Sequence, residues 1–262
     1  MKKLVVLSLA ALLTSLTARS AVSFTGSYTQ DFNSLGTSGG SIAWLNDSTL
    51  AGWSLFQRAG AAITTYAAGD GSSNTGSFYS FGTGTTNDRA LGGTASGGAY
   101  FGSPATGALA GYIAVALQNT SGNDFSSITL SFSGEQWRNG GNATAQTMVL
   151  QYGFGSTFAS VATWVTPGGL FNFTSPVASA SPAAVNGNVA GKVTGLGGTI
   201  STTWANNTTL WVRWIENNDA GNDHGLAVDD LTVSAAPVPE PSSIALAALG
   251  GVLGLVAMRR KR

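Results

Sequence analysis

Apolar and polar residues alternate with a period of two in several segments along the middle of the chain. The apolar positions of four such segments are Ile113, Val115 and Leu117; Ile128, Leu130 and Phe132; Met148, Leu150 and Tyr152; and Leu210, Val212 and Trp214. This period predicts β-strands, because successive side chains of a strand point to opposite faces of the sheet. In the fourth segment, Trp211 and Ile215 make the second face apolar as well.

Segments rich in Gly, Asn and Ser, such as residues 139–142, separate these strands and are typical of turns. Between residues 22 and 235 the sequence contains no segment with the length and 3.6-residue period of a helix, and no internal repeat. Many short strands separated by turns indicate a sandwich or a barrel. We therefore predict one all-β domain, a single β-sandwich, over residues 21–235.

The last predicted strand contains an irregularity. Its apolar positions 226 and 228 are in phase with each other, as are 231 and 233, but the two pairs are three residues apart across Asp229 and Asp230. A β-bulge at this point would turn one of the aspartates toward the rim of the sheet.

The composition fits a packed domain that is secreted and contains no disulfide. Hydrophobic residues make up 43% and aromatic residues 10% of the chain, while charged residues make up 9%. The absence of cysteine excludes disulfides and thiolate metal sites. The formal net charge is zero, but residues 21–236 hold five basic and eleven acidic side chains, a charge of −6. This acidic segment argues against nucleic acid and anionic membranes as partners and favours cations.

The N-terminus has the organisation of a secretory signal peptide. Lys2 and Lys3 precede the apolar residues 4–16, and Ala18-Arg19-Ser20 provides a small-x-small cleavage site. We therefore assign residues 1–20 to a signal peptide, with Ala21 as the first mature residue. The alternative is a retained anchor, but the apolar run is short for a bilayer-spanning helix.

The C-terminus combines a proline-rich break, a short apolar run and a basic cluster. Residues 242–258 are apolar, and as a helix residues 244–258 would cover about 22 Å, less than the hydrocarbon core of about 30 Å. Flanking serines and snorkelling arginines would extend this transmembrane helix enough to span. The basic residues Arg259, Arg260, Lys261 and Arg262 should stay in the cytoplasm and leave the middle of the chain outside.

Residues 236–262 resemble the PEP-CTERM sorting signal of Gram-negative bacteria, through Pro239-Glu240-Pro241, the short Gly- and Ala-rich helix and the basic cluster. The resemblance implies a chain held transiently in the inner membrane. An exosortase then removes the tail, and the mature protein joins the cell surface or an exopolysaccharide matrix. A plain single-span anchor is the alternative.

The middle of the chain resembles a jelly-roll module, through Asp31-Phe32-Asn33, residues 134–138 and residues 225–231. Similar motifs occur in MAM-like and carbohydrate-binding jelly rolls, whose first and last strands pair and often hold a structural Ca²⁺. The resemblance therefore implies a jelly-roll-like fold with a calcium ion bound by Asp31, Asp229 and Asp230. Carboxylate and carbonyl oxygens are the ligands that Ca²⁺ prefers. The alternative for the last two is a turn cap or an ion pair with an arginine.

Two further groups of side chains have a structural and a functional interpretation. Glu135 and Arg138 flank Trp137, and we favour a buried ion pair under a core tryptophan over a sugar-contacting cleft. The seven tryptophans, at positions 44, 53, 137, 164, 204, 211 and 214, could stack on sugar rings, although most should lie in the core.

Catalytic motifs are absent from the sequence. His224, the one histidine, lies in a polar loop with no nucleophile-elbow motif before it. A glycosidase needs two carboxylates across a cleft, and one of the three glutamates belongs to the sorting signal. We therefore expect a structural or adhesive surface protein that is not an enzyme. The alternatives are a carbohydrate-binding module with a defined glycan site and, less favoured, a secreted hydrolase.

Overall fold

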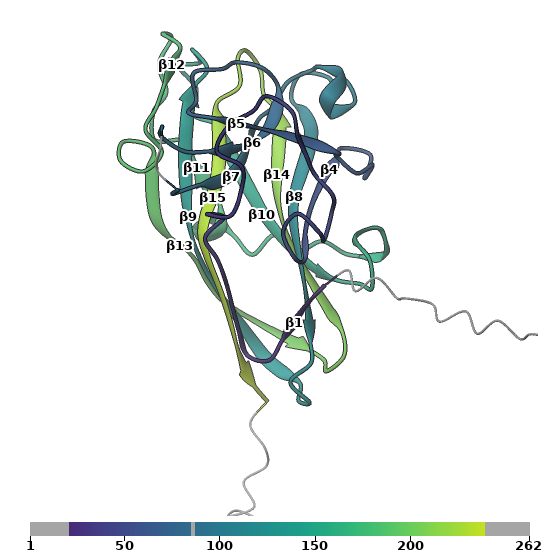
Figure 1. The fold of residues 1–262 in the computed structure, drawn as a ribbon. Coiled ribbons are helices and arrows are strands. Elements are labelled where there is room, and N and C mark those ends of the chain that lie inside the picture. The colour runs from purple at the N-terminus through teal and green to yellow at the C-terminus, as the bar shows by residue number, and fades with distance from the viewer. Residues whose placement is uncertain (1–20, 85–86, 239–262) are drawn as a thin grey trace, which may run out of the picture.

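The computed structural model describes residues 21–84 and 87–238, which form two β-sheets packed face to face (Figure 1). In the six-stranded sheet the order is β1 (Val22–Phe24), β8 (Ala108–Asn119), β14 (Thr209–Asn218), β10 (Thr147–Phe154) and β11 (Phe173–Thr174), and β4 (Trp53–Gln57) also pairs with β8. This arrangement confirms the predicted all-β sandwich.

The nine-stranded sheet has β15 near its centre. Its order is β12 (Ala183–Ala184), β9 (Phe125–Asn139), β15 (Gly225–Pro237), β7 (Ala90–Thr94), β6 (Ser77–Phe81), β5 (Thr65–Gly69) and β3 (Ile42–Ala43). In addition, β13 (Lys192–Trp204) pairs with β9, and β2 (Ser27–Gln30) pairs with β15. The pairing of β2 with the last strand gives the sandwich the jelly-roll-like closure that the resemblance implied.

Helical structure in residues 21–84 and 87–238 is limited to three short 3₁₀ turns, η1 (Ala99–Phe101), η2 (Phe158–Ser160) and η3 (Gly169–Phe171). None of these has the length or apolar character needed to cross a bilayer. The signal peptide (1–20) and the sorting helix predicted within 236–262 fall almost entirely outside the described residues, and β15 itself continues two residues past the predicted domain end at 235.

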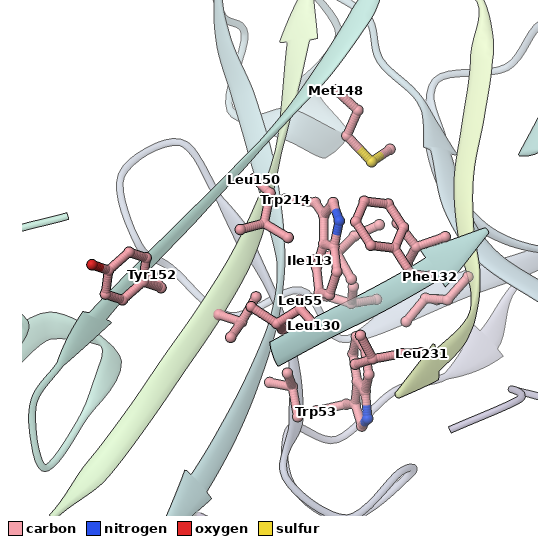
Figure 2. Packing of buried hydrophobic residues seen from close by; sticks show 14 of the residues in the cluster. Trp53, Leu55, Ile113, Leu130, Phe132, Met148, Leu150, Tyr152, Trp214 and Leu231 are labelled. Atoms are coloured by element: carbon pink, nitrogen blue, oxygen red, sulfur yellow. The ribbon is translucent and has the colours of Figure 1, made fainter. Parts of the chain in front are cut away.

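Every alternating segment identified in the sequence lies in a strand, and its in-phase apolar residues point into the space between the sheets. Ile113, Leu130, Leu150 and Trp214 come from β8, β9, β10 and β14 and meet in one cluster (Figure 2). Because each strand buries alternate residues against the other sheet, the alternating pattern of apolar residues fixes the register in which neighbouring strands pair.

Stacked aromatic rings join the two sheets at the centre of this core. Trp53 of β4 and Trp214 of β14 are fully buried, with ring centroids 5.9 Å apart and planes 14° from parallel. From the other sheet, Phe132 of β9 meets Trp214 edge-on at 5.5 Å. Phe32, which follows β2, meets Trp53 at 4.7 Å. Such contacts add to the stabilisation that burial of the large rings provides.

The predicted irregularity in the last strand is a β-bulge. Asp229 lies opposite Ser133 of β9 and Thr232 lies opposite Ser131, so two residues of β15 face one residue of β9. Asp230 has a left-handed backbone, with φ 50°. The bulge turns Asp230 outward while Asp229 stays buried.

We expect Trp214→Ala to lower the free energy of unfolding by about 3–5 kcal/mol, because it removes the ring that links β14 to β4 and β9. This is a large share of the 5–15 kcal/mol typical of a domain. Chemical denaturation of the exported protein measures this change in the free energy of unfolding. Leu170→Ala, at a side chain that is 78% exposed, is the control and should change stability little. Equal losses in both variants would contradict the central role of the ring.

Candidate functional site

The outer face of the six-stranded sheet is apolar over part of its area. Trp211 of β14, Tyr112 of β8 and Phe56 of β4 alternate with core residues and therefore point away from the interior. The small residues Ala114 and Ala116 of β8 pack with Trp211 on this face. The sequence contained one indication of this apolar outer face, because Trp211 and Ile215 make both faces of β14 apolar.

The segment that follows β10 folds back over this face. Its 3₁₀ turn η2 begins with a capping box, in which Thr157 Oγ1 accepts from the Ser160 amide at 3.2 Å and Ser160 Oγ accepts from the Thr157 amide at 2.9 Å. The Trp211 indole N–H donates to the Gly155 carbonyl at 3.1 Å. Val165 then pairs with Tyr152 of β10 through two backbone hydrogen bonds. These contacts fix both ends of the segment that carries Phe158 and Trp164.

Between this segment and the loops around residues 46–47 and 58–60 lies a groove of about 650 Å³, which we call the aromatic groove. This volume is in the range of small-molecule sites. Its lining consists of Asn46, Asp47, Ser54, Phe56, Arg58, Ala59, Gly60, Tyr112, Thr157, Phe158, Ala159, Val161, Trp164 and Trp211.

Arg213 of β14 lies against three rings of the groove. Its guanidinium carbon is 3.8 Å from the centroid of Trp164, 4.3 Å from that of Tyr112 and 5.7 Å from that of Phe158. Gln151 Oε1 on the neighbouring β10 accepts hydrogen bonds from Arg213 Nε at 2.9 Å and Nη2 at 2.6 Å. Burial lowers the pKa of this arginine, which still keeps its charge at neutral pH. The cation–π contacts hold the rings and the guanidinium in one arrangement.

Trp164 differs from the other six tryptophans because its side chain is partly exposed, whereas the other six are buried. The sequence could not distinguish it, because the loop that carries Trp164 has no alternating pattern. A partly exposed aromatic ring beside polar groups can pack on the C–H face of a sugar while the polar groups bond its hydroxyls. The groove therefore offers a partly exposed aromatic ring and polar groups side by side.

The structure brings two of the three predicted calcium ligands together. Asp31 and Asp230 line one pocket of about 280 Å³ at the β2–β15 edge, with Leu231 opposite Gln30 in the adjoining register. Asp229 does not line this pocket and is 1% exposed. Asp230 Oδ2 lies 3.1 Å from Lys192 Nζ, so a lysine already neutralises this carboxylate.

These residues fit a calcium ion only in part. Ca²⁺ takes six to eight oxygens, and the pocket supplies two carboxylates. Within the described ranges, no group of three or more His, Asp or Glu side chains is arranged to hold a metal. Calcium binding by Asp31, Asp229 and Asp230 stays a prediction.

The favoured ion pair between Glu135 and Arg138 is wrong. Glu135 lies on the outer face of β9, where Lys192 Nζ is 3.2 Å from its Oε1 and the Trp137 indole N–H donates to its Oε2 at 3.0 Å. Arg138 Nη1 instead donates to the Gly71 and Ser72 carbonyls, both at 3.0 Å. A register shift in β9, where Leu226 lies opposite Gln136 and Gly225 opposite Arg138, separates the two residues, and each charged group has other partners.

His224 is buried rather than exposed in a turn. Its Nδ1 accepts from the Gly140 amide at 2.9 Å, and burial lowers the pKa of its imidazole. This hydrogen bond gives it a structural role at the end of β9.

The carboxyl groups beside the bulge are buried with raised pKa values. Burial, with the nearby charge of Glu135 as a second cause, raises the pKa of Asp229 from 3.8 to about 8. Burial also raises the pKa of Glu135, although Lys192 opposes this. In the core, Glu216 has a pKa well above 4.5 because it is buried near Asp223 and Asp219.

We expect the free energy of unfolding to fall as the pH rises from about 4 to about 8. Over this window folded Asp229 keeps a proton that the unfolded chain releases, so its contribution is complete below about pH 4 and is lost toward pH 8. Each such group contributes a slope of up to about 1.4 kcal/mol per pH unit. Denaturation of Asp229→Asn across this window should show a shallower slope than the parent, and an unchanged slope would contradict the assignment.

The sorting residues Pro239, Glu240, Pro241, Arg259, Arg260, Lys261 and Arg262 lie outside the described residues. A comparison with protein families does cover this part of the chain. A model described as the PEP-CTERM protein-sorting motif matches residues 237–262. A search of the curated proteins finds no match to this chain.

Two solved structures are similar to the chain. The CBM22-1 xylan-binding domain of Paenibacillus barcinonensis Xyn10C has a TM-score of 0.36 at 8% identity, over 81% of this chain and 95% of that domain. The arabinose-bound α-L-arabinofuranosidase MgGH51 has a TM-score of 0.33 at 10% identity, over 83% of this chain and 30% of the enzyme. Likenesses this distant transfer neither fold nor ligand to this protein.

The family match and the strand pairing together agree with the resemblance found in the sequence. The motif marks an exported protein that an exosortase sorts. The chain carries a PEP-CTERM protein-sorting motif at residues 237–262, which follows an all-β, jelly-roll-like sandwich.

Proposed function

We propose that this protein is a non-catalytic adhesive component of the cell surface or extracellular matrix, and that its aromatic groove binds polysaccharide. The single observation that carries the proposal is the partly exposed Trp164, which Arg213, at 3.8 Å, and the Val165–Tyr152 bridge hold at the side of the groove. A ring positioned before the ligand arrives loses little entropy on binding. The sorting motif is consistent with this location, because it belongs to exported proteins.

Polar groups surround the rings of the groove. Asn46, Ser54, Arg58 and Thr157 offer amide, hydroxyl and guanidinium groups to sugar hydroxyls. The Asn46 Oδ1 is already held by the Trp44 indole N–H at 2.7 Å and the Leu55 amide at 2.9 Å. A few polar groups that are fixed in place beside an apolar floor provide orientation and specificity.

The same lining argues against a hydrolase at this position. Its one carboxylate is Asp47, whose Oδ1 accepts from the Gly52 amide at 2.7 Å. Glycoside hydrolysis uses a pair of carboxylates across the bond that is cleaved. The buried Glu135 and Asp229 belong to the nine-stranded sheet and lie away from the groove.

Trp164→Ala should reduce polysaccharide binding by at least about fivefold, if the ring stacks on a sugar as strongly as aromatic side chains stack on bases, at about 1–3 kcal/mol each. Affinity electrophoresis against a panel of soluble polysaccharides measures the loss. Val189→Ala, an exposed apolar position outside the groove, is the control and should bind like the parent. Binding that persists in Trp164→Ala would remove the groove as the site.

We expect the mature protein to lack the tail that begins within residues 237–262. In cells without the exosortase, or in a chain with Glu240→Ala, the tail should remain and the protein should stay in the inner membrane. Intact mass of protein from membrane and extracellular fractions distinguishes these forms. An extracellular form that retains Arg262 would contradict the sorting assignment.

We also propose calcium as a structural ion at the pocket of Asp31 and Asp230. Its binding should raise the melting temperature in CaCl₂ relative to a chelator, because an ion that binds only the folded state stabilises it. Asp31→Asn should abolish the shift, while Asp124→Asn, at a different edge, should keep it. Equal melting temperatures with Ca²⁺ and chelator would exclude the site.

A further inference from the structure

The distribution of basic side chains over the sandwich is uneven. Between residues 21 and 236 there are five, and three of them are committed to the fold. Arg89 and Arg138 are buried and donate to Ser80 and to backbone carbonyls, respectively. Lys192 bridges Glu135 at 3.2 Å and Asp230 at 3.1 Å.

The two remaining basic residues are both at the aromatic groove. Arg58 lines it and is exposed, and Arg213 lies against Tyr112 and Trp164. Among the described residues, neither arginine has a carboxylate oxygen within 4.0 Å, because the ion pairs found there all involve Lys192. One positive charge therefore lines the groove and a second lies against its rings, both without a counter-charge from the fold.

The acidic side chains lie elsewhere. Asp229 and Asp230 lie in β15 and Glu135 in β9, all in the nine-stranded sheet, and Asp219 and Asp223 follow β14 in the loop to β15. The groove itself has Asp47, whose carboxylate the Gly52 amide already binds. In a segment with a formal charge of −6, the groove is thus a local cationic surface.

We propose that the polysaccharide bound in the aromatic groove is anionic, with carboxylate or sulfate groups that Arg58 binds, while Arg213 adds a positive charge beside the rings of the groove. This inference rests on the proposed carbohydrate-binding function and adds the charge of the ligand. An anionic polymer is repelled by the acidic remainder of the sandwich and attracted at the groove, so the field directs it to one face. Guanidinium groups bind carboxylate and sulfate oxygens through paired N–H donors, and the exposed Arg58 offers such donors at the groove, whereas Gln151 already accepts from Nε and Nη2 of Arg213.

The test compares matched polymers that differ only in charge. Binding of the exported protein to polygalacturonate and to its methyl ester, and to dextran sulfate and dextran, is measured at 20 mM and 300 mM NaCl. We expect at least one anionic polymer to bind about tenfold more tightly than its neutral partner at low salt, and the preference to shrink at high salt.

Variants separate charge from stacking. Arg58→Gln, at an exposed side chain, should weaken binding of the anionic polymer more than binding of its neutral partner, and so reduce the preference about threefold to tenfold. Ser201→Glu, an exposed position on β13 in the other sheet, changes the net charge equally and should keep the preference.

The outcomes distinguish the two proposals. Equal binding of charged and neutral partners that is lost in Trp164→Ala would overturn the anionic ligand and leave the polysaccharide groove intact. If Arg58→Gln and Ser201→Glu reduce the preference for the anionic polymer equally, the preference arises from the net charge of the protein. This result would also overturn the inference. If no polymer binds, or if binding survives Trp164→Ala, the proposed function itself fails.

Discussion

The packing of aromatic rings between the two sheets is the interaction on which the rest of the structure depends. With no cysteine in the chain, covalent cross-links cannot hold the sheets together. Trp53 and Trp214 stack within the six-stranded sheet, and Phe32 and Phe132 contact them from the other side. Because each ring comes from a different part of the chain, the core forms only when β2, β4, β9 and β14 are all in register.

This core leaves each sheet with an outer face, and the two faces differ in chemistry. On the six-stranded sheet, residues that alternate with the core supply the floor of the aromatic groove and Arg213, and Arg58 follows β4 at its side. On the nine-stranded sheet, the same alternation places Glu135 and Asp229 beside the bulge, where Lys192 pairs with Glu135 and burial raises the pKa of Asp229. The alternation of side chains along each strand separates these outer faces from the core, because a residue that is out of phase with the core must lie on the outer face.

The sequence predicted the features that depend on short-range patterns. The strands, the bulge at Asp229–Asp230 and the sorting motif all follow from neighbouring residues, and the structure or the family match agrees with them. The pair of Glu135 and Arg138 was wrong because closeness along a strand does not make two side chains partners, and tertiary contacts supply other partners for both. Lys192 is the true partner of Glu135, and the β9–β13 register that joins them spans more than fifty residues of chain.

The groove could not be predicted from the sequence for a related reason. Its walls come from β4, β8, β14 and the segment after β10, and no pattern within any of these segments reports the others. Trp164 is positioned by the backbone bridge of Val165 to Tyr152 and by stacking on Arg213, both of which are tertiary contacts. The apolar outer face of β14 was a partial signal, since Trp211 forms part of the groove floor.

The place of β15 determines how the molecule responds to tension. This strand pairs with β9 along most of its length, with β2 and β7 on its other edge, and leads directly into the motif at 237–262 (Figure 1). A pull from that end acts along the strand axis, so many ladder hydrogen bonds share the load in shear instead of opening one after another. If a polymer binds at the opposite sheet, as proposed, its drag would reach this strand through the layer of rings.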